Sequence, residues 1–239
     1  MKLSEVIQKR RAMRLYQEGA TLNTETVKSC IEKATLAPSS SNLQLWEFYH
    51  VTSEEKLKKL RAYCFNQVTA RTADQMVVIV TRKDLWRKRC NSNAEFLRKL
   101  YNKEEKDYTK REKFTINYFT KLLPITYGEF FRIFGYLKYS FFSVLGLFRP
   151  VYRELTHNDI RVVAHKSTAL AAQTFMLAMV EAGYDTCPME GIDSRRVKKL
   201  LNLPYGAEIN MVISCGIGTE NGALRPRFRV PFEEVYQEV

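Results

Sequence analysis

The sequence contains few cysteines, and their arrangement excludes the common cysteine-based sites. Only five occur among 239 residues, and they lie far apart, with no C-x-x-C pair and no histidine at a metal-ligand spacing. A zinc site needs clustered Cys or His ligands, and an odd, scattered set is typical of proteins in reducing compartments. We therefore expect free thiols, a cytoplasmic location and no metal site.

Segments that direct a protein into a membrane are also lacking. The N-terminus Met1-Lys2-Leu3-Ser4-Glu5 carries an acid early and has no apolar core of the kind found in signal peptides. The most apolar stretch, Phe141 to Phe148, has about half the length that a membrane-spanning helix requires. We expect neither a signal peptide nor a membrane span.

Familiar catalytic motifs are missing as well. The sequence has no G-x-S-x-G, H-E-x-x-H, Walker loop or G-x-G-x-x-G motif. Its three histidines are isolated; we interpret His50 as a strand-face residue and His157 and His165 as polar surface residues. An enzyme with this inventory would depend on a bound cofactor for its chemistry.

The charge balance is the first positive feature. The formal net charge is +12 in a chain of ordinary composition, with 45% hydrophobic and 27% charged residues. Such an excess fits a phosphate-bearing cofactor, an anionic membrane surface or nucleic acid, and equally a solvated lysine-rich surface. No RNP-like or helix-turn-helix pattern is present, so nucleic acid is not an expected partner.

The pattern of apolar residues predicts an α+β fold in one domain, residues 1–239. Apolar strands are expected at 46–51, 76–80 and 208–215, and the second is apolar throughout, which is typical of burial on both faces. Helices are expected near the N-terminus, after Asn23 or Thr24, from Ser53 to Cys64, from Ala164 to Ala182 and after Asp193. Residues 86–155 are charged and then aromatic, which indicates a helical insertion within the domain.

Two polar features stand out from this frame. The run from Ser39 to Asn42, with Gln44, offers five side chains that can donate or accept hydrogen bonds, more than a surface turn needs. Arginines cluster near both ends of the chain, and guanidinium groups match the geometry of phosphate. Together they suit one phosphorylated ligand with a hydroxylated chain and a heteroaromatic ring, although each cluster alone is typical of a solvated surface. The arginines are Arg10, Arg11, Arg14, Arg225, Arg227 and Arg229.

Four segments resemble, in order, the signatures of the FMN-dependent NAD(P)H nitroreductase family. They are Lys9-Arg10-Arg11-Ala12-Met13-Arg14-Leu15-Tyr16, Ala37-Pro38-Ser39-Ser40-Ser41-Asn42-Leu43-Gln44-Leu45-Trp46, Cys187-Pro188-Met189-Glu190-Gly191 and Arg225-Pro226-Arg227-Phe228-Arg229-Val230-Pro231. The resemblance implies a central mixed or antiparallel sheet flanked by helices and an intertwined homodimer. It also implies a reaction in which NADH or NADPH reduces bound FMN, and the flavin reduces nitroaromatics, quinones or similar acceptors.

The same resemblance assigns roles by motif position, with the flavin rather than a side chain carrying the chemistry. Arg10, Arg11 and Arg14 would hold the phosphate, the ribityl chain and the pyrimidine edge, with Arg14 stabilising negative charge on the reduced ring. Arg227 and Arg229 would close on the phosphate. The ring and ribityl chain would be lined, partly from a second subunit, by Pro38, Ser39, Ser40, Asn42, Gln44, Gln67 (or its neighbour Asn66), Pro188, Glu190 and Gly191.

Two positions depart from the family pattern. Ala12 replaces the usual serine, so one phosphate bond is lost, and Leu45 replaces the usual proline, which leaves that turn less rigid.

Ordinary structural roles remain open for several other residues. Glu190 could be a turn residue, Trp46 a core residue and Gln67 a cap of a neighbouring helix.

The insertion admits three interpretations. In the family this segment forms a lid that selects substrate, and its aromatic and apolar residues, Phe130, Phe131, Phe134, Tyr136, Leu137 and Phe141, could cover the flavin. They could equally pack against the domain or a partner subunit, or contact a membrane surface, since Arg132, Lys138 and Arg149 flank them. The alternatives for function are a different flavin reaction, such as dehydrogenation or reductive dehalogenation, and a basic protein that binds nucleic acid or a membrane surface.

Overall fold

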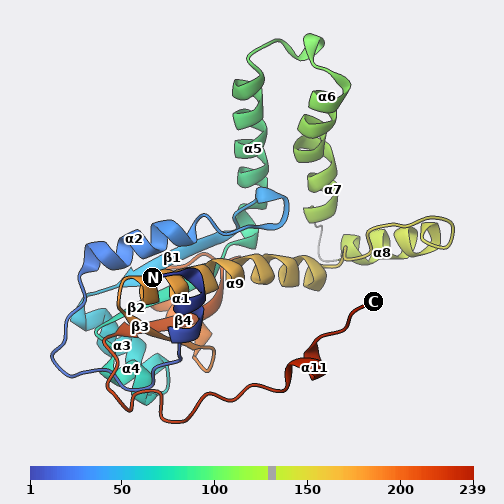
Figure 1. Cartoon of the computed structure of the whole chain (residues 1–239). Coiled ribbons are helices and arrows are strands. Elements are labelled where there is room, and N and C mark those ends of the chain that lie inside the picture. Colours follow the sequence, from blue (N-terminus) through green and yellow to red (C-terminus); the bar gives the residue numbers. More distant parts are fainter. Residues whose placement is uncertain (129–132) are drawn as a thin grey trace.

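A four-stranded antiparallel sheet forms the centre of the protein. The computed structural model describes residues 1–128 and 133–239. Its strands β1 (Trp46–Val51), β2 (Gln75–Thr81), β3 (Asp185–Met189) and β4 (Glu208–Gly216) are arranged in the order β1-β2-β4-β3 (Figure 1). Every residue of β2 is buried, because this strand lies inside the sheet and is covered on both faces.

Helices cover the two faces of the sheet. On one face, α2 (Thr24–Ala34) and α9 (His157–Glu181) pack against β2 and β4, with Val27, Phe175 and Met179 at the centre of the contact. On the other face, α3 (Glu54–Tyr63), α4 (Val68–Thr72) and α10 (Ser194–Leu200) bury Leu57, Leu60 and Val197. Two apolar layers therefore hold the sheet between them.

A helical hairpin projects from this body (Figure 1). Its outgoing arm is α5 (Trp86–Tyr101), and its returning arm consists of α6 (Lys110–Asn117), the π-helical turn η4 (Tyr118–Leu122) and α7 (Leu123–Tyr127). Helix α8 (Ile133–Leu145) follows and extends along the same side of the molecule as the N-terminal end of α9. The base of the hairpin is joined to the body by buried apolar residues: Leu43, Leu45, Cys90, Ala94, Phe119, Leu123, Tyr127, Ile160 and Ala164.

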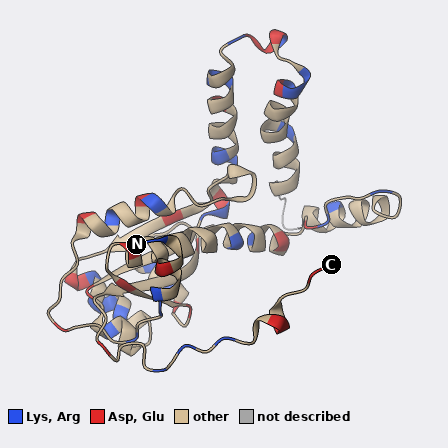
Figure 2. Cartoon of the chain, in the orientation of Figure 1, with Lys and Arg blue, Asp and Glu red and all other residues tan. Residues whose placement is uncertain are grey.

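The two ends of the chain lie outside the sheet. Helix α1 (Leu3–Lys9) precedes the sheet, and an extended tail after Gly218 first passes the end of α1 and then leaves the body to end in the short α11 (Phe232–Val235) (Figure 1). Figure 2 shows basic residues along this tail and acidic residues near its end. None of the helices in the described part of the chain is both long and apolar enough to cross a bilayer.

The predicted α+β class and the three predicted strands are confirmed, and all strand pairs are antiparallel. Strand β3 was not predicted, because it has five residues and contains Pro188, which an edge strand tolerates. Helix α9 begins seven residues before the predicted start at Ala164. A capping box between Thr156 and Asp159 starts it, and this signal was present in the sequence.

Candidate functional site

Residues 9–16, which contain Arg10, Arg11 and Arg14, form the arginine segment. This segment lies along the edge of the sheet that β3 forms. Helix α1 ends at Lys9, and the chain then continues as an extended segment in which Ala12 forms a parallel bridge with Thr186. The amide of Met13 donates to the carbonyl of Thr186 at 3.1 Å, and the amide of Arg14 donates to the carbonyl of Gly222 at 2.6 Å. The backbone is therefore fixed on both sides of the arginines.

A buried hydroxyl network anchors the same segment from below. The Tyr16 hydroxyl donates to the carbonyl of Ser214 at 3.0 Å and lies 2.9 Å from the hydroxyl of Ser214, which is 2.7 Å from that of Thr69. The hydroxyl of Thr69 donates to the carbonyl of Met13 at 3.0 Å. Burial raises the pKa of Tyr16 well above its ordinary value, so the hydroxyl stays protonated and remains a donor.

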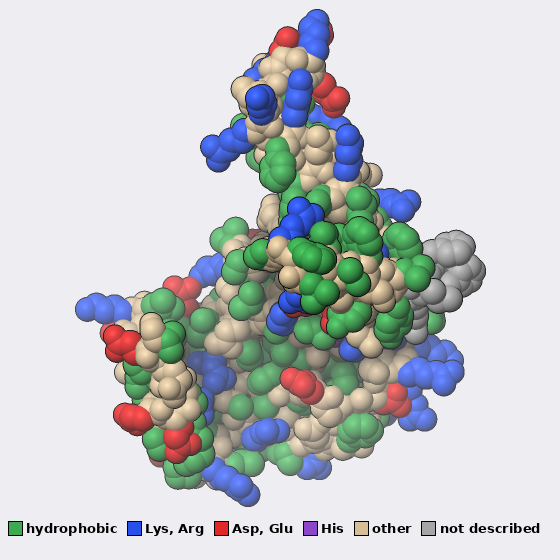
Figure 3. Space-filling view, turned by 90° about the vertical axis from the view of Figure 1, so that its right-hand side faces the viewer, with side chains coloured by type: hydrophobic (Ala, Val, Ile, Leu, Met, Phe, Trp, Pro, Cys, Tyr) green, Lys and Arg blue, Asp and Glu red, His purple; other side chains and the backbone are tan. Residues whose placement is uncertain are grey.

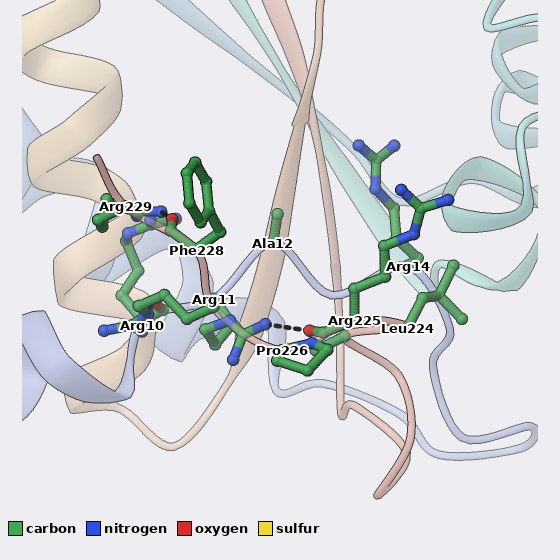
Figure 4. A pocket seen from close by; sticks show the side chains of 11 residues that line it. Arg10, Arg11, Ala12, Arg14, Leu224, Arg225, Pro226, Phe228 and Arg229 are labelled. Atoms are coloured by element: carbon green, nitrogen blue, oxygen red, sulfur yellow. Dashed lines mark hydrogen bonds between the residues drawn. The ribbon is translucent and has the colours of Figure 1, made fainter. Parts of the chain in front are cut away.

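The C-terminal tail returns to this segment and closes a cavity with it. Arg227 donates to the carbonyls of Gln8 and Arg10 at 2.6 and 2.7 Å. Arg11 donates to the carbonyl of Arg225 at 2.6 Å (Figure 4). The cavity has a volume of about 440 Å³. All six predicted arginines line it, with Ala12, Ala223, Leu224, Pro226 and Phe228.

The arginines raise the positive potential around the cavity. Partial burial lowers the pKa of Arg10, and the charges of Arg227, Arg229 and Arg11 lower it further. Repulsion among these guanidinium groups therefore destabilises their charged forms when no anion is bound. Ala12 lines the same cavity and has no hydroxyl to offer, in keeping with its departure from the family pattern.

The Ser39–Gln44 loop contains unusual backbone conformations. Ser41, Asn42 and Gln44 have positive φ angles of 53°, 52° and 48°, which only a few per cent of residues other than glycine adopt. Hydrogen bonds hold this geometry: the Ser39 hydroxyl accepts from the amide of Gln44 at 3.1 Å, and the amide of Ser40 donates to the Ser167 hydroxyl at 3.1 Å. These hydrogen bonds therefore fix the conformation of the loop.

Several side chains of this loop already contact the hairpin. The hydroxyl of Ser41 lies 2.6 Å from that of Tyr118, and the side-chain amide of Asn42 donates to Oδ1 of Asn93 at 3.0 Å. Leu45 is buried at the base of the hairpin, and Trp46 packs against Ala37, Phe48 and Ala171 in the core. The polar run therefore also fastens the hairpin, and Trp46 is a core residue.

Within one chain, the Ser39–Gln44 loop does not meet the arginines. The loop leads into Trp46, which pairs with Thr81 at the far end of β2 on the β1 edge of the sheet. The arginine segment lies at the start of β3, on the opposite edge, where Thr186 pairs with Cys215 and Cys215 pairs with Gln75. The two groups thus occupy diagonally opposite corners of the sheet.

The third motif lies at the end of β3, on the arginine edge. Gln67 donates to the carbonyl of Gly191 at 2.8 Å and to that of Cys64 at 3.1 Å, so its side chain ties two loops together. Its neighbour Asn66 has a positive φ of 48°. Glu190 follows the strand directly, as a turn residue would, and lines a second cavity of about 330 Å³. Burial raises the pKa of Cys187, one residue before Pro188, although Arg14 and Arg10 oppose this effect.

The polar residues opposite Glu190 were not predicted from the sequence. The second cavity is also lined by Arg161, His165, Lys166 and Asn210. His165, predicted to be a polar surface residue, is half-buried and lies 3.1 Å from Glu208 and 3.0 Å from Asn210. Arg161 and His165 are four residues apart and share one face of α9, a spacing that the sequence displayed.

No metal site emerges in the part of the chain that the structure describes, where His, Cys, Asp and Glu form no group of three or more suited to an ion. All five cysteines are buried and free.

The comparisons with known proteins agree on one family. The model of the nitroreductase family matches residues 7–217. The chain is 25% identical over 234 residues to "Putative NAD(P)H nitroreductase MhqN" of Bacillus subtilis, covering 97% of this chain and 96% of that protein. It is 25% identical over 227 residues to protein DrgA of Synechocystis, covering 95% and 89%.

Solved structures have the same fold. A Bacillus subtilis structure, ydfN, superposes with a TM-score of 0.75 at 22% identity, covering 100% of this chain and 99% of the other. A structure from Exiguobacterium sibiricum, determined in complex with FMN, gives a TM-score of 0.69 at 21% identity, covering 100% and 98%. With four ordered motifs, this fold and a family match over most of its length, the chain belongs to the nitroreductase family.

Proposed function

We propose that this protein is an oxidoreductase that binds FMN and transfers electrons from NADH or NADPH to nitroaromatic, quinone or similar acceptors. The observation that carries the proposal is the arginine-lined cavity, which residues from both ends of the chain form together. The family membership supports an oxidoreductase, and one structural relative contains FMN.

The residues around the cavity suit a phosphate group. Arginine forks bind phosphate oxygens in pairs, and these charge-assisted bonds are about twice as strong as neutral ones. A phosphate would also offset the repulsion from neighbouring arginines, which adds to the effect of burial in lowering the pKa of Arg10. The cavity volume of about 440 Å³ lies in the ordinary range for small-ligand sites.

The remaining roles follow from the positions of the side chains. Arg10, Arg11, Arg227 and Arg229 would bind the phosphate, and the exposed Arg14 would hold a positive charge beside the ring. Gln67 would orient the backbone at Gly191, since it donates to that carbonyl. When bound, FMN supplies the reversible uptake and release of a hydride.

A homodimer would complete this site. The Ser39–Gln44 loop and the arginines lie at opposite corners of one chain, so a single subunit does not present both to one ligand. Leu3 and Ile7 on α1 and Phe228 and Phe232 in the tail are large apolar residues that one chain leaves exposed. We propose that a second copy packs against these residues and supplies its own Ser39–Gln44 loop to the arginines.

An absorbance spectrum of the purified protein tests the proposal. We expect flavin bands, oxidation of NADH or NADPH when a quinone is added, and a mass in solution of two chains by light scattering. The double variant Arg227→Ala/Arg229→Ala should lose the flavin. The control variant Arg111→Ala removes a positive charge from α6 on the hairpin instead and should keep the flavin. A colourless protein that takes up no added FMN would contradict the proposal.

A further inference from the structure

Helix α8 carries an exposed apolar stripe. Five large apolar residues repeat at intervals of three and four positions, which places them on one side of the helix, and all five are exposed. Phe148, just beyond the helix, is the most exposed of them at 82%. The stripe consists of Phe134, Leu137, Phe141, Val144 and Phe148.

A different side of α8 fixes the helix to the body. At Gly135, an added Cβ would lie 3.2 Å from the carbonyl oxygen of Leu155, so helix and chain approach closely there. The ammonium group of Lys138 is buried and donates to the carbonyls of Ile125, Thr126 and Gly128 at 2.9 to 3.1 Å. These contacts hold the apolar stripe outward, and Lys138, which was expected at its flank, faces inward.

The turn after α8 adds basic residues to the apolar tip. Leu147 and Phe148 are exposed at this turn, and Arg149 follows them in the open. Arg153 donates to the carbonyl of Gly146 at 3.2 Å and so ties the returning chain to the turn. Arg132, the other flanking charge expected from the sequence, lies outside the described residues, as do Phe130 and Phe131.

The charged side chains from α8 through residue 153 are all basic, and the first acid, the exposed Glu154, comes directly after them. Residues 133–153 contain no Asp or Glu, and their only charged side chains are Lys138, Arg149 and Arg153. Tyr136 and Tyr139 lie beside the stripe, and tyrosine is favoured where lipid meets water. Figure 3 shows hydrophobic side chains gathered on this side of the molecule, below the hairpin, with Lys and Arg side chains around them.

We propose that α8 and the turn at 146–149 form a docking surface for an anionic lipid bilayer. The apolar stripe would enter the interfacial region of the bilayer while Arg149 and Arg153 contact lipid phosphates. The net charge of +12 and the lack of acidic residues in 133–153 favour a negatively charged surface over a second copy of this basic chain. The contact is peripheral, since α8 has only 13 residues.

Cosedimentation of the full-length protein with vesicles tests the proposal. We expect binding to vesicles of phosphatidylcholine with about 30% phosphatidylglycerol, at least about tenfold weaker binding to pure phosphatidylcholine, and loss of binding as salt is raised. The variant Leu137→Ser/Phe141→Ser should bind anionic vesicles at least about tenfold more weakly. Arg149→Gln should weaken binding to anionic vesicles and leave binding to neutral vesicles unchanged.

A matched control separates this surface from general hydrophobicity. Phe96 and Leu100 on α5 are exposed by 65% and 64%, as Phe141 and Leu137 are by 65% and 62%. Phe96→Ser/Leu100→Ser should therefore bind vesicles as the wild type does, and thermal melting should show that both double variants are folded. Equal loss in the two double variants, or no binding of the wild type at low salt, would overturn the proposal. So would a change from dimer to monomer in Leu137→Ser/Phe141→Ser, which would assign the stripe to a second copy.

Discussion

The hydroxyl of Tyr16 donates a 3.0 Å hydrogen bond to the carbonyl of Ser214 and thereby joins the arginine segment to the inner strand β4. The Tyr16 ring also lies against Gly216, where an added Cβ would be 2.5 Å from the ring. Tyr16 belongs to the same motif as the arginines and thus anchors that motif to the core. Arg10, Arg11 and Arg14 reach the cavity from a backbone that cannot easily shift.

Removal of the Tyr16 hydroxyl should destabilise the protein. Tyr16→Phe leaves the ring in place and deprives two buried groups, the carbonyl and the hydroxyl of Ser214, of one partner each. We expect the free energy of unfolding to fall by about 1–3 kcal/mol, as measured by urea denaturation. Tyr205→Phe is the control, because Tyr205 is 91% exposed, and it should change stability little. Equal stability of Tyr16→Phe and the wild type would show that the hydrogen bond contributes nothing.

Arg227 should be needed for its shape as well as its charge. Its guanidinium donates to two carbonyls at the end of α1 while lining the cavity. Arg227→Lys keeps the charge and loses the planar fork, so the dissociation constant of FMN should rise about tenfold, equivalent to about 1.4 kcal/mol. Quenching of flavin fluorescence measures it. Arg111→Lys, on α6, should bind FMN as the wild type does; if Arg227→Lys also does, charge alone accounts for Arg227.

Substitutions at Gln44 distinguish the effect of its strained backbone on stability from the effect of its side chain on FMN binding. Its φ of 48° is costly for a residue with a side chain but not for glycine. Gln44→Gly should therefore raise the free energy of unfolding by up to about 1 kcal/mol, while the affinity for FMN falls because the amide is lost. Gln44→Ala, which keeps the strain, should lose affinity without gaining stability. Calorimetry and flavin titration check both. Unchanged affinity in both variants would remove Gln44 from the site.

Local signals were enough to predict much of the fold. Strands at 46–51, 76–80 and 208–215 and the cap at Asp193 were visible because each rests on residues close together in the sequence. Strand β3 was missed because its five residues include Pro188 and give only a weak local signal, so that the strand is recognised through its pairing with β4. The sequence linked the two arginine clusters only through a shared phosphorylated ligand and the family resemblance; in the structure, Arg227 donates to the carbonyl of Arg10, 217 positions away.

The second cavity could not be foreseen in the same way. His165 was predicted to be a surface residue, since nothing near it in sequence reveals Glu208 and Asn210, which β4 brings to it. The positions of the loop hydroxyls were equally hidden. The partners of Ser41 and Asn42, Tyr118 and Asn93, belong to the hairpin, and only the folded chain places the hairpin against the loop.

Stability at acidic pH should depend on Glu208. Burial alone would raise the pKa of its carboxyl, but hydrogen bonds from Arg161 and His165 outweigh burial and lower the pKa below its ordinary value of 4.5. A lowered pKa means that ionised Glu208 stabilises the fold above about pH 4.5 and that this contribution is lost as the pH falls through the folded-state pKa. Arg161→Gln should therefore reduce stability at about pH 7 more than at about pH 3 in urea titrations. Arg111→Gln should show no such difference, and a pH-independent effect of Arg161→Gln would rule out this linkage.

The cavity between the Ser39–Gln44 loop and α8 should influence which acceptors the proposed oxidoreductase reduces. It has a volume of about 330 Å³, and its walls include Ser41, Tyr118, Leu122 and Phe142. A carboxylate in this largely apolar space should weaken the binding of an apolar acceptor, because the charge would lose solvation when the acceptor enters. Leu122→Glu should therefore raise the KM for a naphthoquinone at least about tenfold and leave the KM for NADH or NADPH unchanged. Leu100→Glu, at an exposed site on α5, should alter neither constant. An equal rise in both constants for Leu122→Glu would point to damage of the flavin site instead, and unchanged constants would exclude this cavity from acceptor binding.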